Sequence, residues 1–174
     1  MRRLLVVVGL LAACRTSSIR ARWTHVEDAA RIDRVELYVS IQHDARVGVM
    51  FRSFETRMQA RLAACDVRTT IVHGRPEGEA LRGSTPRLTV APSEGTYTNV
   101  RVVDQYGGTL DERRTTKLDA SFRLELFDPR VRKATWRMIV DVKTSTTPDT
   151  GDGKAFADLV LTQLRAAGVI TCGG

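Results

Sequence analysis

The chain has 174 residues, with 27 Lys and Arg against 20 Asp and Glu and a formal net charge of +7. This length suits one domain with a sizeable core. The cations are mostly arginines scattered along the chain, and they form no basic stripe with interleaved aromatic residues. We therefore expect no nucleic-acid partner.

The first 14 residues have the order of a bacterial secretory signal: two arginines, an apolar run from Leu4 to Ala13, and Cys14. A transmembrane helix needs about 20 apolar residues, so this run is too short to span a membrane. A plain secretory signal with an incidental cysteine, or a short buried helix, are alternatives that these residues leave open.

Residues 14–31 carry mixed charge with no clear period, so we expect a tether there and a single domain at 32–174. From Val35 to Gln42 apolar and polar residues alternate, which predicts a half-buried strand. Apolar residues then recur at spacings of three and four, which predicts an amphipathic helix. That apolar stripe consists of Val47, Phe51, Phe54, Met58 and Leu62.

Four shorter elements are expected next. Residues 67–73 are typical of a second strand, and residues 74–86 are polar and rich in Gly and Pro, which predicts a loop. Residues 87–91 and 94–105 predict two further strands.

Two long alternating segments, 118–126 and 134–142, flank an Asp128-Pro129 turn and predict an antiparallel hairpin whose dry face contains Trp136. Residues 144–153 indicate a loop, and we expect its Asp152 to cap a last helix that ends at Gly168. The order of elements predicts an α+β fold. It is a two-layer sandwich of a mainly antiparallel twisted sheet with two helices on one face, preceded by a signal peptide.

Cys65 and Cys172 form an even pair once Cys14 is set apart. In an oxidising compartment an even pair favours a disulfide, and both cysteines fall near the ends of predicted helices that could pack side by side. Two buried free thiols are the alternative. A third interpretation makes Cys65 a thiol nucleophile with His73 as its base.

The sequence contains no constellation that indicates a metal or a cofactor. His25, His43 and His73 are isolated, and no His or Cys pair has the spacing of metal ligands. Residues 149–154 superficially resemble calcium and phosphate loops. They lack the EF-hand glutamate and the P-loop spacing, so a turn is the expectation.

The segment Leu11–Cys14 resembles a lipobox, the site at which bacterial lipoproteins are acylated and cleaved. This resemblance implies that residues 1–13 are a signal peptide and that Cys14 carries the lipid. With the β-α-β unit, the Trp136-Arg137 pair and the helix end from Leu164 to Gly168, the chain resembles small bacterial envelope lipoproteins. These include curli-export and exopolysaccharide-export lipoproteins and accessory lipoproteins of transport and cell-wall systems.

That resemblance implies a non-catalytic binding or scaffold subunit, anchored by lipid and facing the periplasm. The partner would be an envelope protein or a second copy of the chain. Arg15, rather than an aspartate, follows the cysteine, which favours the outer membrane. The alternative is a periplasmic hydrolase acting on cell-wall or lipid substrates with carboxylates on the strands, and Asp119, Glu125 and Asp141 are its candidates.

Overall fold

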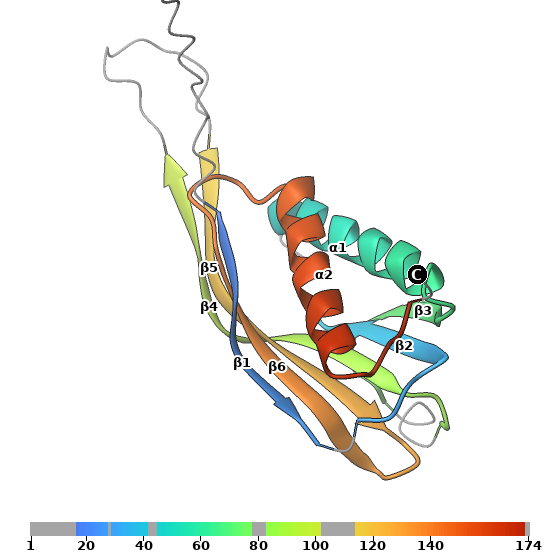
Figure 1. Cartoon of the computed structure of the whole chain (residues 1–174). Helices are drawn as coiled ribbons and strands as arrows, with labels where there is room; N and C mark the ends of the chain where they lie inside the picture. Colours follow the sequence, from blue (N-terminus) through green and yellow to red (C-terminus); the bar gives the residue numbers. More distant parts are fainter. Residues whose placement is uncertain (1–16, 28, 42–44, 78–82, 102–113, 173–174) are drawn as a thin grey trace, which may run out of the picture.

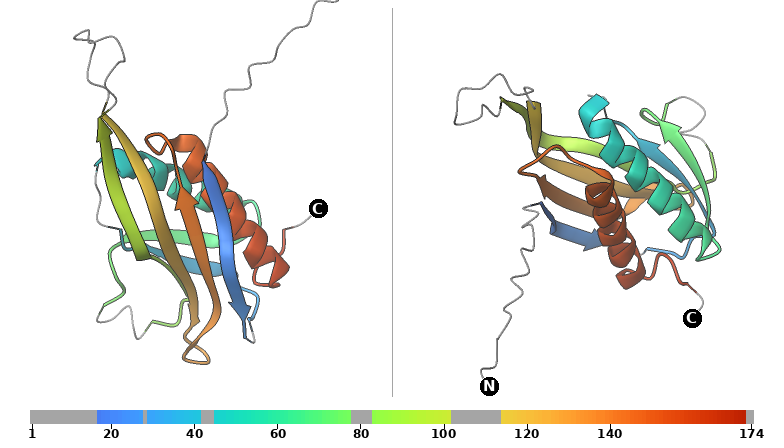
Figure 2. Two further views of the ribbon diagram at one scale, coloured as in Figure 1. Left: turned by 90° about the vertical axis from the view of Figure 1, so that its left-hand side faces the viewer. Right: turned by 90° about the horizontal axis from the view of Figure 1, so that it is seen from above.

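The structure is a computed structural model that describes residues 17–27, 29–41, 45–77, 83–101 and 114–172. The elements are β1 (Ser18–Val26), β2 (Arg34–Val39), α1 (Ala45–Ala63), β3 (Arg68–His73), β4 (Arg87–Arg101), β5 (Arg114–Asp128), β6 (Lys133–Lys143) and α2 (Thr150–Ala166). The strands form one six-stranded sheet in the order β1-β6-β5-β4-β2-β3. Strand β2 runs parallel to β3 and β4, and the other pairs are antiparallel. Both helices cover the same face of this twisted sheet, so the expected α+β sandwich is confirmed (Figures 1 and 2).

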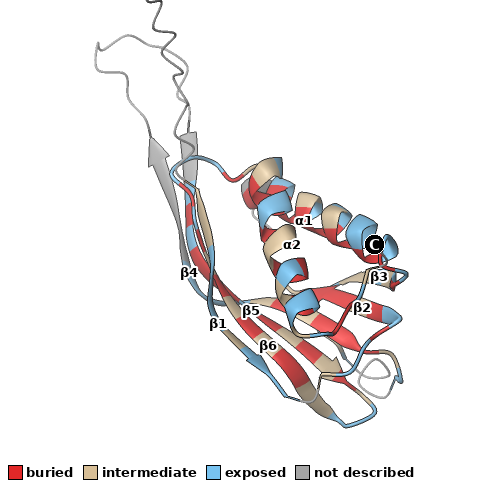
Figure 3. Cartoon of the chain, viewed as in Figure 1, coloured by how far each residue is buried: buried red, intermediate tan, exposed pale blue. Residues whose placement is uncertain are grey.

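The core lies between the sheet and the helices, where buried residues are concentrated (Figure 3). The alternating residues of β5 and β6 supply one side, and Trp136 is fully buried among them. The apolar stripe of α1 supplies the other side, and the ring of Phe156 from α2 packs against Phe51, Phe54 and Phe122. Burial of apolar surface on this scale is the main favourable term in folding.

The two helices pack very closely near the start of α2. A β-carbon placed on Gly153 would lie 2.1 Å from the carbonyl oxygen of Met50 and 2.8 Å from Cβ of Ser53. Only a glycine allows this approach, because any side chain would force the helices apart. The Ser53 hydroxyl also donates to the carbonyl of Thr150 at 2.7 Å, and Arg57 pairs with Asp158.

Both helices end in the same hydrogen-bonded motif. In α2, Gly168 has φ of 70°, and the amide of Val169 donates to the carbonyl of Leu164. In α1, Asp66 has φ of 58°, and the amide of Val67 donates to the carbonyl of Leu62. This Schellman arrangement satisfies the last carbonyls and turns the chain sharply.

Three expectations about local structure need correction. Residues 18–26, expected within a tether, form β1 and pair with β6. The two strands expected at 87–91 and 94–105 are one strand, β4, with a bulge between Pro92 and Glu94. The residue that caps α2 is Asp149, and Asp152 lies three positions later, where its carboxylate accepts a hydrogen bond from the Asp149 amide in a capping box.

The differences in β1 and β4 have physical reasons. A bulge between Ala21 and Trp23 shifts the register of β1, so its sequence lacks an unbroken period of two. Pro92 lies two positions beyond Val90, the last residue of β4 that pairs with β2, so its missing N–H costs no ladder bond on that side.

Strands β4 and β5 extend beyond their neighbours. The last residue of β6, Lys143, pairs with Asp119, which pairs with Thr96. Beyond this level, residues 97–101 and 114–118 pair with each other as a two-stranded arm. At the base of the arm, the carbonyl of Leu118 also accepts a hydrogen bond from the amide of Thr144. Figure 1 shows the arm projecting past the helices.

Candidate functional site

The predicted lipidation site, Cys14, lies outside the described residues. Strand β1 begins at Ser18, only four residues further along the chain. Most of the segment expected as a tether is therefore a folded strand.

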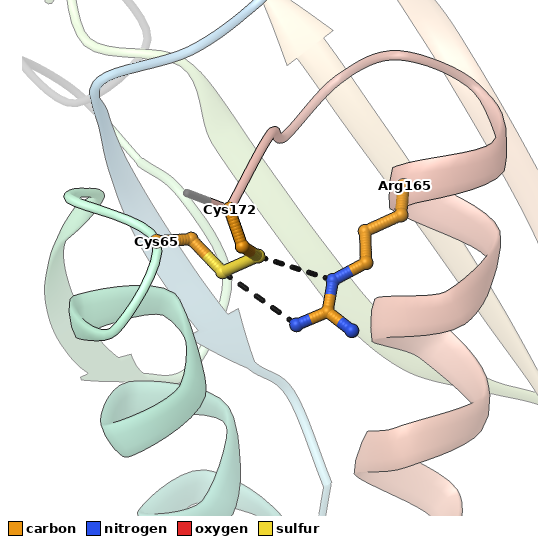
Figure 4. The surroundings of a disulfide bond; sticks show 3 residues. All are labelled: Cys65, Arg165 and Cys172. Carbon is orange, nitrogen blue, oxygen red and sulfur yellow. Dashed lines mark hydrogen bonds between the residues drawn. A yellow bond between two sulfur atoms is a disulfide. The ribbon is translucent and has the colours of Figure 1, made fainter. Parts of the chain in front are cut away.

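Cys65 and Cys172 form a disulfide, as expected (Figure 4). Cys65 is buried at the end of α1, and Cys172 follows the returning segment Val169–Ile170, whose first carbonyl accepts from the Ile32 amide. The guanidinium of Arg165 lies over the bond, with Nε 3.1 Å from Sγ of Cys172. Because both sulfurs are bonded, Cys65 has no thiol to act as a nucleophile with His73.

The helix-free face of the sheet carries a compact polar network. The bulge in β1 directs Arg22 toward β6, where its Nε donates to Oδ2 of Asp141 at 2.9 Å and its Nη2 donates to Oγ of Ser121 at 2.7 Å. The Ser121 hydroxyl donates to Oδ1 of Asp141 at 2.6 Å. The hydrogen bond from Arg22 holds the pKa of the Asp141 carboxyl below its usual value, against the opposing effect of burial.

The same face continues as a ladder of ion pairs. Glu125 lies 3.5 Å from Nε of Arg137, and Asp119 lies 2.9 Å from Nζ of Lys143. Every carboxylate considered for the hydrolase alternative thus has a cationic partner. A general acid needs a raised pKa, whereas the pKa of Asp141 is lowered by its hydrogen bond from Arg22. The arrangement suits a solvated recognition surface better than acid–base chemistry.

Near β2, the helix-free face carries two buried polar side chains, Tyr38 and Arg87. Tyr38 is buried there, and its hydroxyl donates to Glu36 at 3.1 Å. Burial raises the pKa of this phenol, and the bond to Glu36 raises it further. The guanidinium of Arg87 lies 4.5 Å above the ring of Phe127, a cation–π contact that covers part of the sheet.

A hollow of about 600 Å³ opens where β2 and β3 end beside the bulge of β4. Its lining includes Ser40, His73, Arg75 and Glu94. Nδ1 of His73 lies 3.6 Å from Oε1 of Glu55, a buried carboxylate on α1. In the pairing of β2 with β3, His73 lies opposite Val39 and not opposite Ser40. Since alternate residues of a strand point to opposite faces, Ser40 does not share the face on which His73 meets Glu55.

An exposed aromatic pair lies on β1 at the edge of the sheet. The Trp23 ring is 47% exposed and stacks on His25, with centroids 5.7 Å apart. Exposed large aromatic side chains are typical anchors of protein interfaces.

Some of these residues stand out in the sequence, although no expectation was based on them. Glu55 is one of them, because this charged residue directly follows Phe54 and lies four positions after Phe51, within the apolar stripe of α1. Arg22 and Ser121 carry no such signal, because only the pairing of β1 with β6 brings Arg22 to the other two.

Within the described residues, no group of three or more His, Cys, Asp or Glu is placed to hold a metal ion. Among the described helices, none combines the length and the apolar character that crossing a bilayer requires.

No known family model matches the chain, and no curated protein sequence matches it significantly. The chain is distantly similar to a number of solved structures, two of which follow. The PelC dodecamer from Paraburkholderia phytofirmans is 16% identical, with a TM-score of 0.46 over 88% of this chain and 98% of that chain. A neuraminyllactose-binding hemagglutinin homologue from Helicobacter pylori is 9% identical, with a TM-score of 0.41 over 80% of this chain and 89% of that chain. Both likenesses are distant, and neither informs on the site.

Proposed function

We propose that this chain is a lipid-anchored, non-catalytic binding or scaffold subunit of an envelope assembly, export or transport system. Its anchor is in the outer membrane and its domain faces the periplasm. The observation that carries the proposal is the leader, which ends in the lipobox-like segment Leu11–Cys14. The disulfide between Cys65 and Cys172 supports it, because such bonds persist in the oxidising compartment outside the cytoplasm.

The domain offers two surfaces to a partner, which is an envelope protein or a second copy of the chain. One is the helix-free face with its ion pairs. The other is the edge formed by β1, which carries the exposed ring of Trp23 beside a row of backbone groups that no described strand pairs. An added strand from a partner satisfies such an edge. The bulge in β1 limits random pairing, so the edge would accept only a partner that fits it.

The anchor is tested by replacing Cys14 with Ser in cells. We expect the Cys14→Ser protein to lose incorporated palmitate and to leave the membrane fraction, while its disulfide and circular dichroism spectrum stay unchanged. Thr16→Ser, which leaves Cys14 in place, is the matched control and should remain membrane-bound. Full membrane retention of the Cys14→Ser protein would overturn the proposal.

The partner surface is tested by crosslinking in intact cells, followed by identification of the crosslinked species. Trp23→Ser should reduce the capture of an envelope protein or of a second copy severalfold. Val131→Ser removes another exposed apolar side chain, in the turn between β5 and β6, and should leave capture unchanged. Equal capture by the two variants would exclude the β1 edge as the binding surface.

A further inference from the structure

The hollow at the ends of β2 and β3 forms because the sheet divides there. Val90 is the last residue of β4 that pairs with β2, and a bulge between Pro92 and Glu94 follows. Beyond this bulge, β4 pairs with β5 alone among the described strands, whereas β2 ends at Val39. Bulges redirect strands and side chains, and they are frequent next to functional sites. The hollow thus lies outside the carboxyl ends of parallel strands, where open sheets commonly bind their ligands.

Backbone hydrogen bonds hold the rim of the hollow in place. Two of its lining residues, Ser40 and Gly74, directly follow the ends of β2 and β3. The Ser40 amide donates to the carbonyl of Val90 at 2.9 Å, and the Gly74 amide donates to the carbonyl of Val39 at 3.0 Å. These bonds preorganise the rim, which lowers the entropic cost of binding a ligand.

The size and the walls of the hollow suit a small molecule. Pockets that bind small molecules measure about 300–1,000 Å³ and combine apolar walls with a few polar groups. This hollow, of about 600 Å³, lies within that range. Its apolar part consists of Val39, Ile41, Pro92, Gly95 and Ala120. An apolar group of a few carbon atoms can therefore lie against these walls.

Arg75 and Glu94 bring opposite charges to the hollow without neutralising each other. Both residues line it and both are exposed. Within the described residues, neither forms an ion pair with its nitrogen and oxygen atoms within 4.0 Å, although Glu94 acts on Arg22 at longer range. A ligand that is only an anion would be repelled by Glu94, and one that is only a cation would be repelled by Arg75. The pair is complementary to a ligand that carries both charges.

We propose that this hollow binds a small zwitterion, a molecule with a primary ammonium group and an anionic group beside a short apolar group. The guanidinium of Arg75 binds the anionic group, and the carboxylate of Glu94 accepts hydrogen bonds from the ammonium group. A free aliphatic amino acid has this chemistry, and the ethanolamine phosphate headgroup of a lipid shares its two charges. The inference goes beyond the proposed function and does not depend on the lipid anchor.

The test is an NMR titration of the full-length protein in detergent micelles, which follows the backbone amide signals of Gly74 and Glu94. The ligands are leucine, 4-methylpentanoate, which lacks the ammonium group of leucine, and 3-methylbutylamine, which lacks its carboxylate. We expect saturable shifts with leucine and a Kd about three- to fivefold lower than for either analogue. The expected factor is modest because both protein charges are exposed to solvent.

Two variants test the role of each charge separately. Arg75→Gln should weaken the binding of leucine and of 4-methylpentanoate about threefold, and should not weaken the binding of 3-methylbutylamine. Glu94→Gln should weaken the binding of leucine and of 3-methylbutylamine by a similar factor, and should not weaken the binding of 4-methylpentanoate. The matched control is Arg61→Gln, which removes an exposed arginine from the last turn of α1 and should leave all three affinities unchanged.

A parallel titration with glycerophosphoethanolamine distinguishes the two sources of the zwitterion. Saturable shifts with this headgroup and none with leucine would support the zwitterion site and assign it to a lipid. Saturation by neither molecule would overturn the proposal, as would equal affinity for leucine and its two analogues, which indicates an unselective apolar hollow. Cys14→Ser should bind like the parent protein, so failure of the anchor test would leave this site intact.

Discussion

Removal of the disulfide should cost this domain a large part of its stability. The bond joins residues 107 positions apart, so it closes a loop that includes the strands β3 to β6 and the helix α2. The chain-entropy relation assigns about 5 kcal/mol to a loop of this length. Domains of this kind have total stabilities of about 5–15 kcal/mol. We therefore expect Cys65→Ala with Cys172→Ala to lower the free energy of unfolding by about 3–5 kcal/mol.

The measurement is urea unfolding followed by circular dichroism, with the oxidised protein, the reduced protein and the double variant compared at one temperature. The reduced protein and the double variant should agree within about 1 kcal/mol, because both lose the same loop constraint. Arg165→Met is the matched control: it removes the guanidinium beside the sulfurs but keeps the bond. It should cost less than about 1 kcal/mol, as a contact on the exposed side of a helix does. A loss below about 1 kcal/mol in the double variant would refute the loop-closure reasoning.

Two further predictions concern helix packing and pH. Gly153→Ala should destabilise the domain by about 1–3 kcal/mol in thermal unfolding, because the added methyl group collides with the backbone at Met50. Gly48→Ala, whose nearest new neighbour is the flexible end of an arginine side chain, should be neutral or stabilising, and equal losses for both would contradict the close-packing argument. The lowered pKa of Asp141 means that its contribution to stability is complete above the ordinary value of 3.8 and is lost as pH falls through the folded-state pKa. In urea unfolding, the free energies of unfolding of the wild-type protein and of Arg22→Met should therefore differ most at neutral pH and converge below about pH 4. A difference in free energy that does not change with pH would exclude the pair of Arg22 and Asp141 as its cause.

Local patterns in the sequence sufficed for the main elements. The period of two in β5 and β6 and the spacing of three and four in α1 reflect the side-chain geometry of strands and helices. For this reason the buried positions of Phe51, Phe122 and Trp136 were predictable. The disulfide was predictable as well, since two cysteines near helix ends in an oxidising compartment have few other roles.

The features that depend on pairing were not predictable. The bulge at Arg22 breaks the period of β1, so the segment resembles a linker until β6 lies beside it. In the network of Arg22, Ser121 and Asp141, Arg22 lies 99 positions from Ser121 along the chain, and Ser121 lies 20 positions from Asp141. No local sequence pattern encodes contacts over such separations.

What the sequence by itself determined is the apolar periodicity of each element, the cysteine pair and the leader that ends in Cys14, because each depends on residues close together in the chain. What only the tertiary structure decided is the relation between distant segments. It placed β1 at the edge of the sheet, brought Gly153 against α1 and set the arm of β4 and β5 at the end of the sheet where β1 begins. These relations follow from strand register and helix packing, whose energies arise from contacts between residues far apart in sequence.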